Sequence, residues 1–318
     1  VGAQSILNRQ SDFSFGDFTA FLFAVFSMLH PLKAVTNSIT DIKKAMVSVD
    51  RVAEILDLSS EIIEADSPIE KTTFNEKIVF KNVSFSYNEN QQILKNVNFE
   101  IKKGEKVAFV GASGSGKTTI ANLINRMYDP TNGEILMDGI NLKKLSIRHL
   151  RKMFGIVTQE SILFSDSVEN NVKYGAFEDV GHEKVLEACQ FAYADEFIET
   201  LPDKYNSMIL PHGYNFSGGQ RQRICIARAI VDDPDILIFD EATSALDTDS
   251  EKKVQNAIDQ AAGNRTVVLI AHRLSTILSA DKIFVLEQGQ LVGSGNHDEL
   301  LSNCPQYRHF YNLQFKHD

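Results

Sequence analysis

The feature that most restricts the fold is a glycine-rich octapeptide between two apolar segments. Residues 111–118 read GASGSGKT and match the pattern GxxxxGK[ST]. Lys106–Val110 before them predicts a short buried strand, and apolar residues at helical spacing after them predict a helix. Where a strand turns through glycines into a helix, backbone N–H groups and the positive helix end converge on a site for an anion. The pattern therefore predicts an α/β domain whose sheet ends at a phosphate site.

The octapeptide also assigns roles to single side chains. We expect Lys117 to reach the β- and γ-phosphates of a nucleotide and Thr118 to ligate Mg²⁺. The alternative is a glycine-rich turn with a chance lysine, which the flanking strand and helix oppose. The residues of this segment expected to contact the nucleotide are Gly111, Ser113, Gly114, Ser115, Gly116, Lys117, Thr118 and Thr119.

An acidic pair at the end of a second apolar strand supplies the expected metal contact. Residues 236–239 read ILIF and are followed directly by Asp240 and Glu241. A continuous apolar run is typical of a parallel strand covered on both faces. Asp240 is expected to hold Mg²⁺, and Glu241 to polarise an attacking water as general base. Taken alone the pair could be a solvated acidic turn, but the phosphate loop favours a site.

Phosphate loops serve many enzymes, so a further segment decides between them. Residues 216–220 read FSGGQ, followed by RQR, and resemble the LSGGQ signature of ATP-binding cassette (ABC) proteins, with Phe in place of the first Leu. Ser217 and the glycine N–H groups at an expected helix start form a second anion cradle. A simple helix N-cap is the alternative. The nucleotide contacts expected here are Ser217, Gly218, Gly219 and Gln220.

The resemblance implies a head-to-tail dimer in which each signature closes on the nucleotide of the other copy. It also implies an adenine-stacking role for Tyr87, a loop glutamine at Gln159, a loop between the copies at Ser244–Asp247 and a γ-phosphate contact at His272. Each alone would be an unremarkable strand, surface or structural residue. The catalytic residues implied are Glu241, His272, Gln159 and Lys117. The metal ligands implied are Thr118, Gln159 and Asp240, with ATP and Mg²⁺ as cofactors.

The N-terminal residues differ from the rest of the chain. No Asp, Glu, Lys or Arg lies between Asp17 and Lys33, yet the stretch is shorter than the ~20 residues of a spanning helix. Periodicity alone leaves a membrane helix and a buried core helix open. Residues 34–58 then become amphipathic, and lysines after the apolar run fit a cytoplasmic exit.

Two further segments resemble ABC exporters. Asp166–Val172 is typical of exporters rather than importers. The helix around His30–Lys33 is similar to the last membrane helix of half-transporters such as bacterial lipid A flippases and multidrug exporters. This favours a membrane helix over about 15–34. The family has six such helices in each half-transporter, so we expect about five of them to be absent from this chain. The domains expected are a membrane-domain fragment (1–58), a linker (59–77) and an ABC nucleotide-binding domain (78–318). The fold expected is the RecA-like P-loop NTPase α/β fold with antiparallel β and α-helical subdomains.

One segment departs from the exporter pattern. Exporters usually carry Gly-Glu-Arg-Gly before the signature, where it touches the membrane domain of the partner, whereas this chain has Leu210–Gly213 (LPHG). The acidic and basic side chains are lost. We expect the ATP chemistry not to depend on them.

Composition limits the partners. A formal net charge of -10 argues against binding a nucleic-acid backbone. Three separate cysteines without a CxxC pair favour burial in a reducing compartment over a metal or disulfide framework. The partners expected are a second copy or a related half-transporter, the transmembrane domain and the membrane. The location expected is the inner (plasma) membrane, with this domain in the cytoplasm.

The function expected is ATP hydrolysis coupled to export or flipping of a lipid-like or hydrophobic substrate. A soluble cassette ATPase acting on DNA or ribosomes would need basic patches or a long coiled coil. A non-enzymatic scaffold would need to have lost Lys117, Glu241 or His272, and all three are present. An importer ATPase normally lacks membrane helices on its own chain, so the apolar N-terminal stretch disfavours it.

Overall fold

The computed structural model describes residues 14–57, 62–88, 91–240, 248–263, 265–271 and 274–315. The chain divides into two compact units, Val1–Glu61 and Ile62–Asp318.

The first unit is described as one long helix, α2 (Phe15–Leu56). Ser14 begins it with a capping box, because its hydroxyl accepts from the Asp17 N–H and the Asp17 carboxylate accepts from the Ser14 N–H. None of its side chains is buried, and by length and composition the helix could cross a membrane. The expected membrane helix and its amphipathic continuation thus form a single element, with Pro31 inside it.

The second unit contains an antiparallel sheet in the order β2-β1-β4-β5. Its strands are β1 (Lys77–Asn88), β2 (Gln91–Lys102), β4 (Asn132–Met137) and β5 (Ile140–Asn141). The inward face of β1 changes along its length. Ile78 and Phe80 are buried before a register shift at Asn82, which has φ of 51°, and Val83 and Phe85 are buried after it. A bulge therefore interrupts the simple alternation of inward and outward side chains along β1.

The central sheet has the order β10-β9-β3-β8-β7-β6. Its strands β3 (Lys106–Val110), β6 (Phe154–Val157), β7 (Ile236–Asp240), β8 (Thr266–Ile270) and β9 (Lys282–Glu287) run parallel, and β10 (Gln290–Gly295) is antiparallel to β9. The apolar run of β7 is buried, as predicted for a strand covered on both faces, and that of β8 is buried as well.

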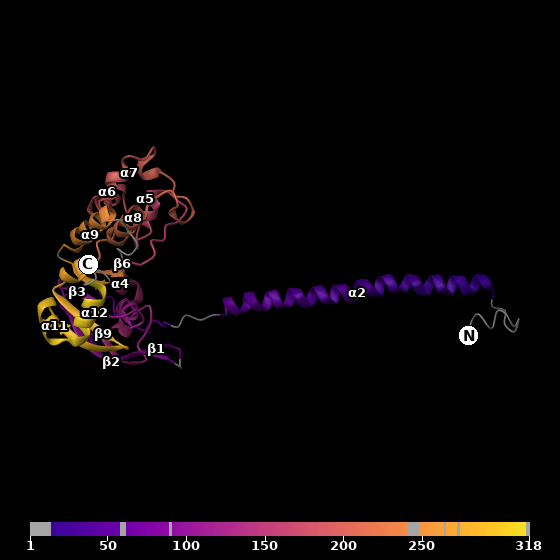
Figure 1. Cartoon of the computed structure of the whole chain (residues 1–318). Helices are drawn as coiled ribbons and strands as arrows, with labels where there is room; N and C mark the ends of the chain where they lie inside the picture. The colour runs from indigo at the N-terminus through magenta and orange to yellow at the C-terminus, as the bar shows by residue number, and fades with distance from the viewer. Residues whose placement is uncertain are drawn as a thin grey trace. The chain divides into compact units, whose positions relative to one another are not determined.

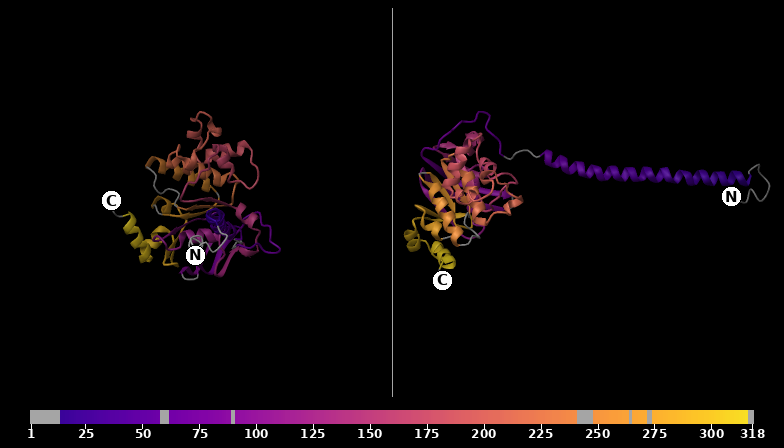
Figure 2. Two further views of the ribbon diagram at one scale, coloured as in Figure 1. Left: turned by 90° about the vertical axis from the view of Figure 1, so that its right-hand side faces the viewer. Right: turned by 90° about the horizontal axis from the view of Figure 1, so that it is seen from above.

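Helices cover the central sheet and build a separate lobe. They are α3 (Lys117–Ile124), α4 (Ile147–Lys152), α5 (Val168–Lys173), α6 (His182–Phe191), α7 (Asp195–Ile198), α8 (Gly218–Ile230), α9 (Thr248–Ala262), α10 (Leu274–Leu278), α11 (His297–Asn303) and α12 (Pro305–Phe315). Figure 1 shows α5, α6 and α7 gathered at the end of this unit away from β1 and β2. The left-hand view of Figure 2 shows the same separation after a turn of 90°. The predicted α/β fold with antiparallel and helical subdomains is confirmed.

Two apolar cores hold the unit together. One joins the central sheet to the antiparallel sheet and α3, through residues such as Phe80, Phe109 and Ile120. The other joins the opposite face of the central sheet to α8, α9 and the helical lobe. Cys189, Cys225 and Cys304 are free and buried, as expected, and desolvation raises the pKa of the Cys189 thiol to about 12.

The segment expected as a linker is attached to the second unit from Ile62 onward. Phe74 is fully buried, and its N–H donates to Asp235 at 2.9 Å. The Asp138 carboxylate accepts from the N–H groups of residues 75–77 and pairs with Lys71 at 2.8 Å. These contacts therefore attach the chain before residue 78 to the second unit, and the expected domain boundaries stay predictions.

Candidate functional site

The turn between β3 and α3 has the backbone that the octapeptide predicts. Gly111 has φ of +148°, and a Cβ there would lie 2.1 Å from the Leu286 carbonyl oxygen. Gly116, the N-cap of α3, has φ of +105°, and a Cβ would lie 2.6 Å from a Leu94 methyl carbon. Side chains at these positions would be strained and would collide with neighbouring strands. Both glycines are therefore needed for the loop to lie this close to the sheet.

Lys117 lies over its own loop. Its side chain is 5% exposed, and its Nζ donates to the carbonyl oxygens of Gly111 at 2.9 Å and Ala112 at 3.0 Å. The first residue of α3 thus holds a positive charge above the curved backbone, together with the positive end of the helix dipole. The arrangement concentrates positive potential where an anion would enter.

Ser115 is an unsatisfied polar group inside the loop. Its side chain is 4% exposed, and its Oγ has no hydrogen-bond partner. A buried hydroxyl without a partner is unfavourable unless a ligand supplies one. The Ser115 hydroxyl is therefore available to donate a hydrogen bond to a phosphate oxygen.

An aromatic wall faces the outer part of the loop. Tyr87 is 44% exposed, and its hydroxyl lies 3.2 Å from the Thr119 Oγ1. Phe85 and Tyr128 pack edge-on to its ring at 4.8 Å and 5.1 Å between centroids. These contacts fix the phenol and leave part of the ring open to solvent, where a flat base could stack.

The aromatic wall and the glycine loop line one cavity of about 240 Å³. It brings together seven of the predicted contacts, namely Tyr87, Ser113, Gly114, Gly116, Lys117, Thr118 and Thr119. Ile93 lines it as well, and the sequence did not single that residue out. Phe85 and Tyr128, which hold Tyr87, were also missed. The aromatic alternation of β1 could have indicated Phe85, but nothing in the sequence points to Tyr128.

Strand register places the acidic residue at the same edge as the loop. Asp240 is opposite Ile270 of β8, and Ile270 is opposite Phe109 of β3, just before the loop. On the other side, Phe239 is opposite Val157 of β6, two residues before Gln159. Neighbouring strands are about 4.8 Å apart. Asp240, Gln159 and Gly111 therefore all follow carboxyl ends of parallel strands, the edge at which such sheets bind ligands.

The donor set at this edge fits Mg²⁺. Thr118 and Gln159 are exposed and Asp240 is partly exposed, so a hydroxyl, an amide oxygen and a carboxylate can reach solvent. Mg²⁺ prefers such oxygen ligands and completes its shell with water and phosphate oxygens. Within the described residues no cluster of three or more His, Cys, Asp or Glu side chains forms an all-protein metal site.

The signature segment forms the start of α8. Ser217 is the N-cap in a capping box, because the Gln220 N–H donates to the Ser217 Oγ at 3.3 Å and the Ser217 N–H donates to the Gln220 side chain at 2.8 Å. Phe216 is buried against Phe197. Ser217 itself is exposed and Gly218 is partly exposed, so the positive end of α8 can be reached from solvent.

The departure from the exporter pattern forms a 3-10 turn, Pro211–Gly213, before the signature. His212 has φ of 58° and Gly213 has φ of 68°. A Cβ at Gly213 would lie 2.7 Å from the Arg221 side chain, so this turn fits closely against α8. Leu210 and Tyr214 on either side are exposed, at 54% and 79%. Pro211 and His212 thus stand where the family carries an acidic and a basic side chain, with exposed Leu210 and Tyr214 on either side of the turn.

Three predicted elements lie outside the described residues. They are Glu241, the Ser244–Asp247 loop and His272. Their predicted roles stay predictions.

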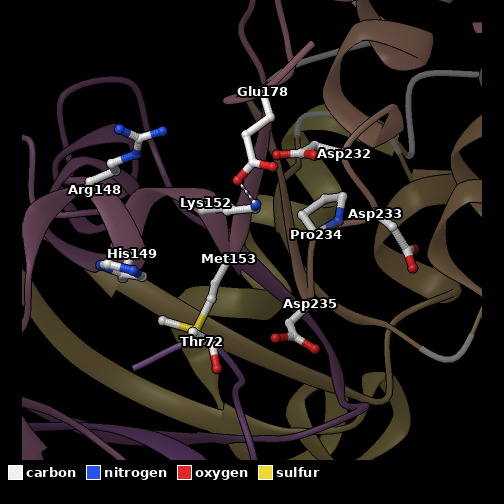
Figure 3. A pocket seen from close by; sticks show the side chains of 10 residues that line it. All are labelled: Thr72, Arg148, His149, Lys152, Met153, Glu178, Asp232, Asp233, Pro234 and Asp235. Carbon is white, nitrogen blue, oxygen red and sulfur yellow. Dashed lines mark hydrogen bonds and ion pairs between the residues drawn. The ribbon is translucent and has the colours of Figure 1, made fainter. Parts of the chain in front are cut away.

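This unit has further cavities. One of about 380 Å³ is lined by residues 111–115, the end of β9 and α12. The other, of about 410 Å³, lies between α4 and the turn after α8, where Lys152 pairs with Glu178 at 2.9 Å (Figure 3). Its lining residues Met153 and Asp235 directly precede β6 and β7, so it lies at the amino ends of these strands. It is therefore separate from the ligand-binding edge of the sheet.

Comparison with known proteins agrees with this geometry. Residues 94–244 match the family model described as ABC transporter. The chain is similar to the ATP-dependent lipid A-core flippase of Syntrophus aciditrophicus (45% identity over 303 residues, covering 95% of this chain and 50% of the relative). It is also similar to the flippase of the same name from Haemophilus influenzae (41% over 314 residues, 98% and 53%).

A solved structure is similar over nearly the whole chain. It is a bacterial Atm1-family ABC exporter with ATP bound, with a TM-score of 0.78 and 34% identity, covering 99% of this chain and 55% of that one. The chain thus spans about half the length of the curated relatives it matches.

Proposed function

Because the chain belongs to the ABC transporter family and carries its ATP-binding domain, we propose that it hydrolyses MgATP between two copies and thereby drives export of a lipid-like or hydrophobic substrate. The observation that carries the proposal is the cavity shared by Tyr87 and the glycine loop, with Asp240 at the same sheet edge. The relatives named as lipid A-core flippases support the substrate class.

The residues of one copy bind and orient the nucleotide. Adenine stacks on Tyr87, and the loop N–H groups, Ser115 and Lys117 hold the phosphates. Lys117 exchanges the Gly111 and Ala112 carbonyls for phosphate oxygens, which are stronger acceptors because they are charged. The cradle is thus already folded before ATP arrives, so little backbone ordering is needed.

Thr118, Asp240 and Gln159 would hold the metal. When bound, Mg²⁺ offsets phosphate charge and fixes the orientation of the β- and γ-phosphates. Glu241 accepts a proton from the attacking water, and His272 contacts the γ-phosphate. The site residues therefore divide into those that grip the phosphates and those that act on the water.

A second copy completes the site. The exposed Ser217 and the N–H groups of Gly218 and Gly219 are poised to meet an anion from outside their own chain. Donors on both sides of the γ-phosphate stabilise the charge that develops during transfer. Closing the dimer moves the membrane domains. The full-length protein accordingly lies in the inner membrane, with this domain in the cytoplasm. Helix α2, which could span a membrane, supports that location.

The test is phosphate release by the purified chain in detergent with MgATP. Turnover should rise faster than linearly with protein concentration, because the active form contains two copies. Removing Mg²⁺ with a chelator should stop it. Turnover that is strictly proportional to protein at all concentrations, or absent at concentrations where ATP is bound and the chain is dimeric, would contradict the proposal.

A further inference from the structure

One arginine joins the signature helix to the loop that carries Gln159. Arg228, on the last turns of α8, donates from Nη1 to the Ile162 carbonyl at 2.8 Å. It also donates from Nε to the Asn171 carbonyl at 2.7 Å and from Nη2 to the Asn171 Oδ1 at 2.9 Å. The guanidinium group thus bridges three acceptors on the segment 158–175, which contains Gln159 and α5.

This guanidinium group has no carboxylate partner among the described residues. Desolvation lowers the pKa of Arg228, although the group stays charged. Burying a cation is unfavourable unless hydrogen bonds replace its water. Three charge-assisted bonds do so here, and the planar fork of arginine suits their geometry in a way that a lysine does not. The position therefore requires arginine for its shape as well as its charge.

Asn171 connects the Arg228 guanidinium group to the backbone of the loop that contains Gln159. It is fully buried, and its side chain exchanges hydrogen bonds with both the N–H (2.8 Å) and the carbonyl (3.0 Å) of Phe164. The Phe164 ring lies under the guanidinium, 5.4 Å from Cζ to the ring centroid. A movement of the loop would therefore displace all of these groups together.

Two more contacts tie the same segment to α8. A Cβ at Gly175 would lie 1.8 Å from the Arg228 carbonyl oxygen, so the chain after α5 rests directly on the helix. Ser161, two residues after Gln159, donates a hydrogen bond to the Gln222 side chain on the first half of α8. The attachment thus runs along most of the helix whose first residues form the signature.

We propose that Arg228 is a positioning residue that makes the Gln159 loop and the signature helix move as one body. The inference rests on the proposed function. Gln159 faces the nucleotide of its own copy, whereas Ser217 faces that of the partner. A rigid link between them therefore couples the two ATP sites of the dimer, because ATP at one site shifts the cradle offered to the other.

The test compares Arg228→Lys with the parent and with Arg223→Lys. Arg223 is a matched control, since it is a buried arginine of the same helix whose bonds outside α8 go to the Tyr193 carbonyl at 2.6 Å and to Glu196. Within α8 it donates to the Gly219 carbonyl at 3.4 Å. Amide hydrogen exchange without nucleotide reports the link, and ATP turnover against ATP concentration reports the coupling. We expect Arg228→Lys to speed exchange in 158–175 and leave 106–124 unchanged, whereas Arg223→Lys acts on 193–199.

The kinetic result separates positioning from general damage. The parent should show a Hill coefficient above 1 for ATP. Arg228→Lys should bring it to about 1 and lower kcat roughly 10-fold, with KM changed less than about twofold. Arg223→Lys should keep the parental Hill coefficient. If the lysine variant fails to fold, Phe164→Leu, which removes only the ring under the guanidinium, should give the same changes at smaller size.

Several outcomes would overturn the proposal: parental exchange in 158–175, a Hill coefficient of 1 in the parent, or equal loss of cooperativity in both arginine variants. An inactive parent would instead defeat the proposed function. The exchange comparison would still decide in that case whether Arg228 holds the loop.

Discussion

The Lys117 ammonium group donates to the carbonyl oxygen of Gly111 at 2.9 Å, so the loop's principal cation is held by the loop's own backbone. The same Gly111 has a φ of +148° and lies too close to Leu286 for any side chain. The curved backbone therefore fixes the position of the Lys117 ammonium group, and the hydrogen bond from Lys117 stabilises the curve, before any nucleotide is present. A phosphate has only to replace two carbonyl oxygens around a group already in position.

Lys117→Ala should weaken ATP binding strongly. Hydrogen bonds to charged groups contribute about 1.5–3 kcal/mol, so the dissociation constant should rise roughly 10- to 100-fold. Titration calorimetry with MgATP measures this directly. The exposed lysine Lys103 provides a control, because Lys103→Ala removes the same charge away from the cavity. Equal affinities for the Lys117 variant and the parent would contradict the assignment of the loop.

Ser115→Ala should separate folding from binding. The Ser115 Oγ is buried without a partner, so removing it should leave the free energy of unfolding unchanged or raise it by up to about 1 kcal/mol in the absence of nucleotide. ATP affinity should nevertheless fall, because a phosphate oxygen loses a donor. Urea unfolding and calorimetry on the same samples give both quantities. A variant that is destabilised but binds ATP normally would mean that the hydroxyl serves the fold alone.

Glu241→Gln should keep ATP binding and dimer closure while slowing turnover roughly 100-fold or more. The amide preserves size but cannot accept the proton of the attacking water. Phosphate release under saturating MgATP is the measurement, and ATP affinity measured in parallel is the control. Near-parental turnover would remove Glu241 from its proposed role as general base.

Asp138 should make the docking of residues 71–77 sensitive to acid. Burial by itself raises the pKa of Asp138, but hydrogen bonds from Lys71 and three backbone N–H groups outweigh it and hold the pKa below its ordinary value of 3.8. The stabilisation is thus present above the unfolded-state pKa and is lost as pH falls through the lower folded-state value. Hydrogen exchange of 71–77 between pH 5 and pH 2 should show this loss.

Asp138→Asn should lower the free energy of unfolding by about 1–3 kcal/mol at pH 7, since it leaves Lys71 without its counter-charge. The same change at the exposed Asp66 is the control and should have little effect. An Asp138→Asn variant that unfolds at the parental urea concentration would show that the carboxylate does not hold the segment.

The chemistry of the site could be predicted because short contiguous motifs encode it. The glycine loop, the strand that ends at Asp240 and the capping residue Ser217 each depend on neighbouring residues, and the structure forms each element where expected. Strands β3 and β7 of the central sheet could be predicted from their apolar residues. The membrane role of α2 and the domain boundaries stay predictions.

Contacts between distant segments could not be predicted. The bulge at Asn82 changes which side chains of β1 point inward, and the residues around Asn82 do not predict it. The docking of residues 62–76 depends on Asp138 and Asp235, which look like ordinary turn acids in the sequence. Arg228 likewise reads as a helix cation until its partners at Ile162 and Asn171 are known. Tertiary pairing, rather than propensity, decides these features.

The central claim is that the signature of a second copy closes on the nucleotide, and the mass of the ATP-bound particle tests it most directly. In the Glu241→Gln background, sedimentation in detergent with saturating MgATP should give twice the mass of the nucleotide-free chain. Adding Gly218→Asp, which places negative charge in the cradle, should keep the single-copy mass although ATP still binds. Dimers that form equally well with Gly218→Asp, or a single-copy particle saturated with ATP in the Glu241→Gln chain, would contradict the account.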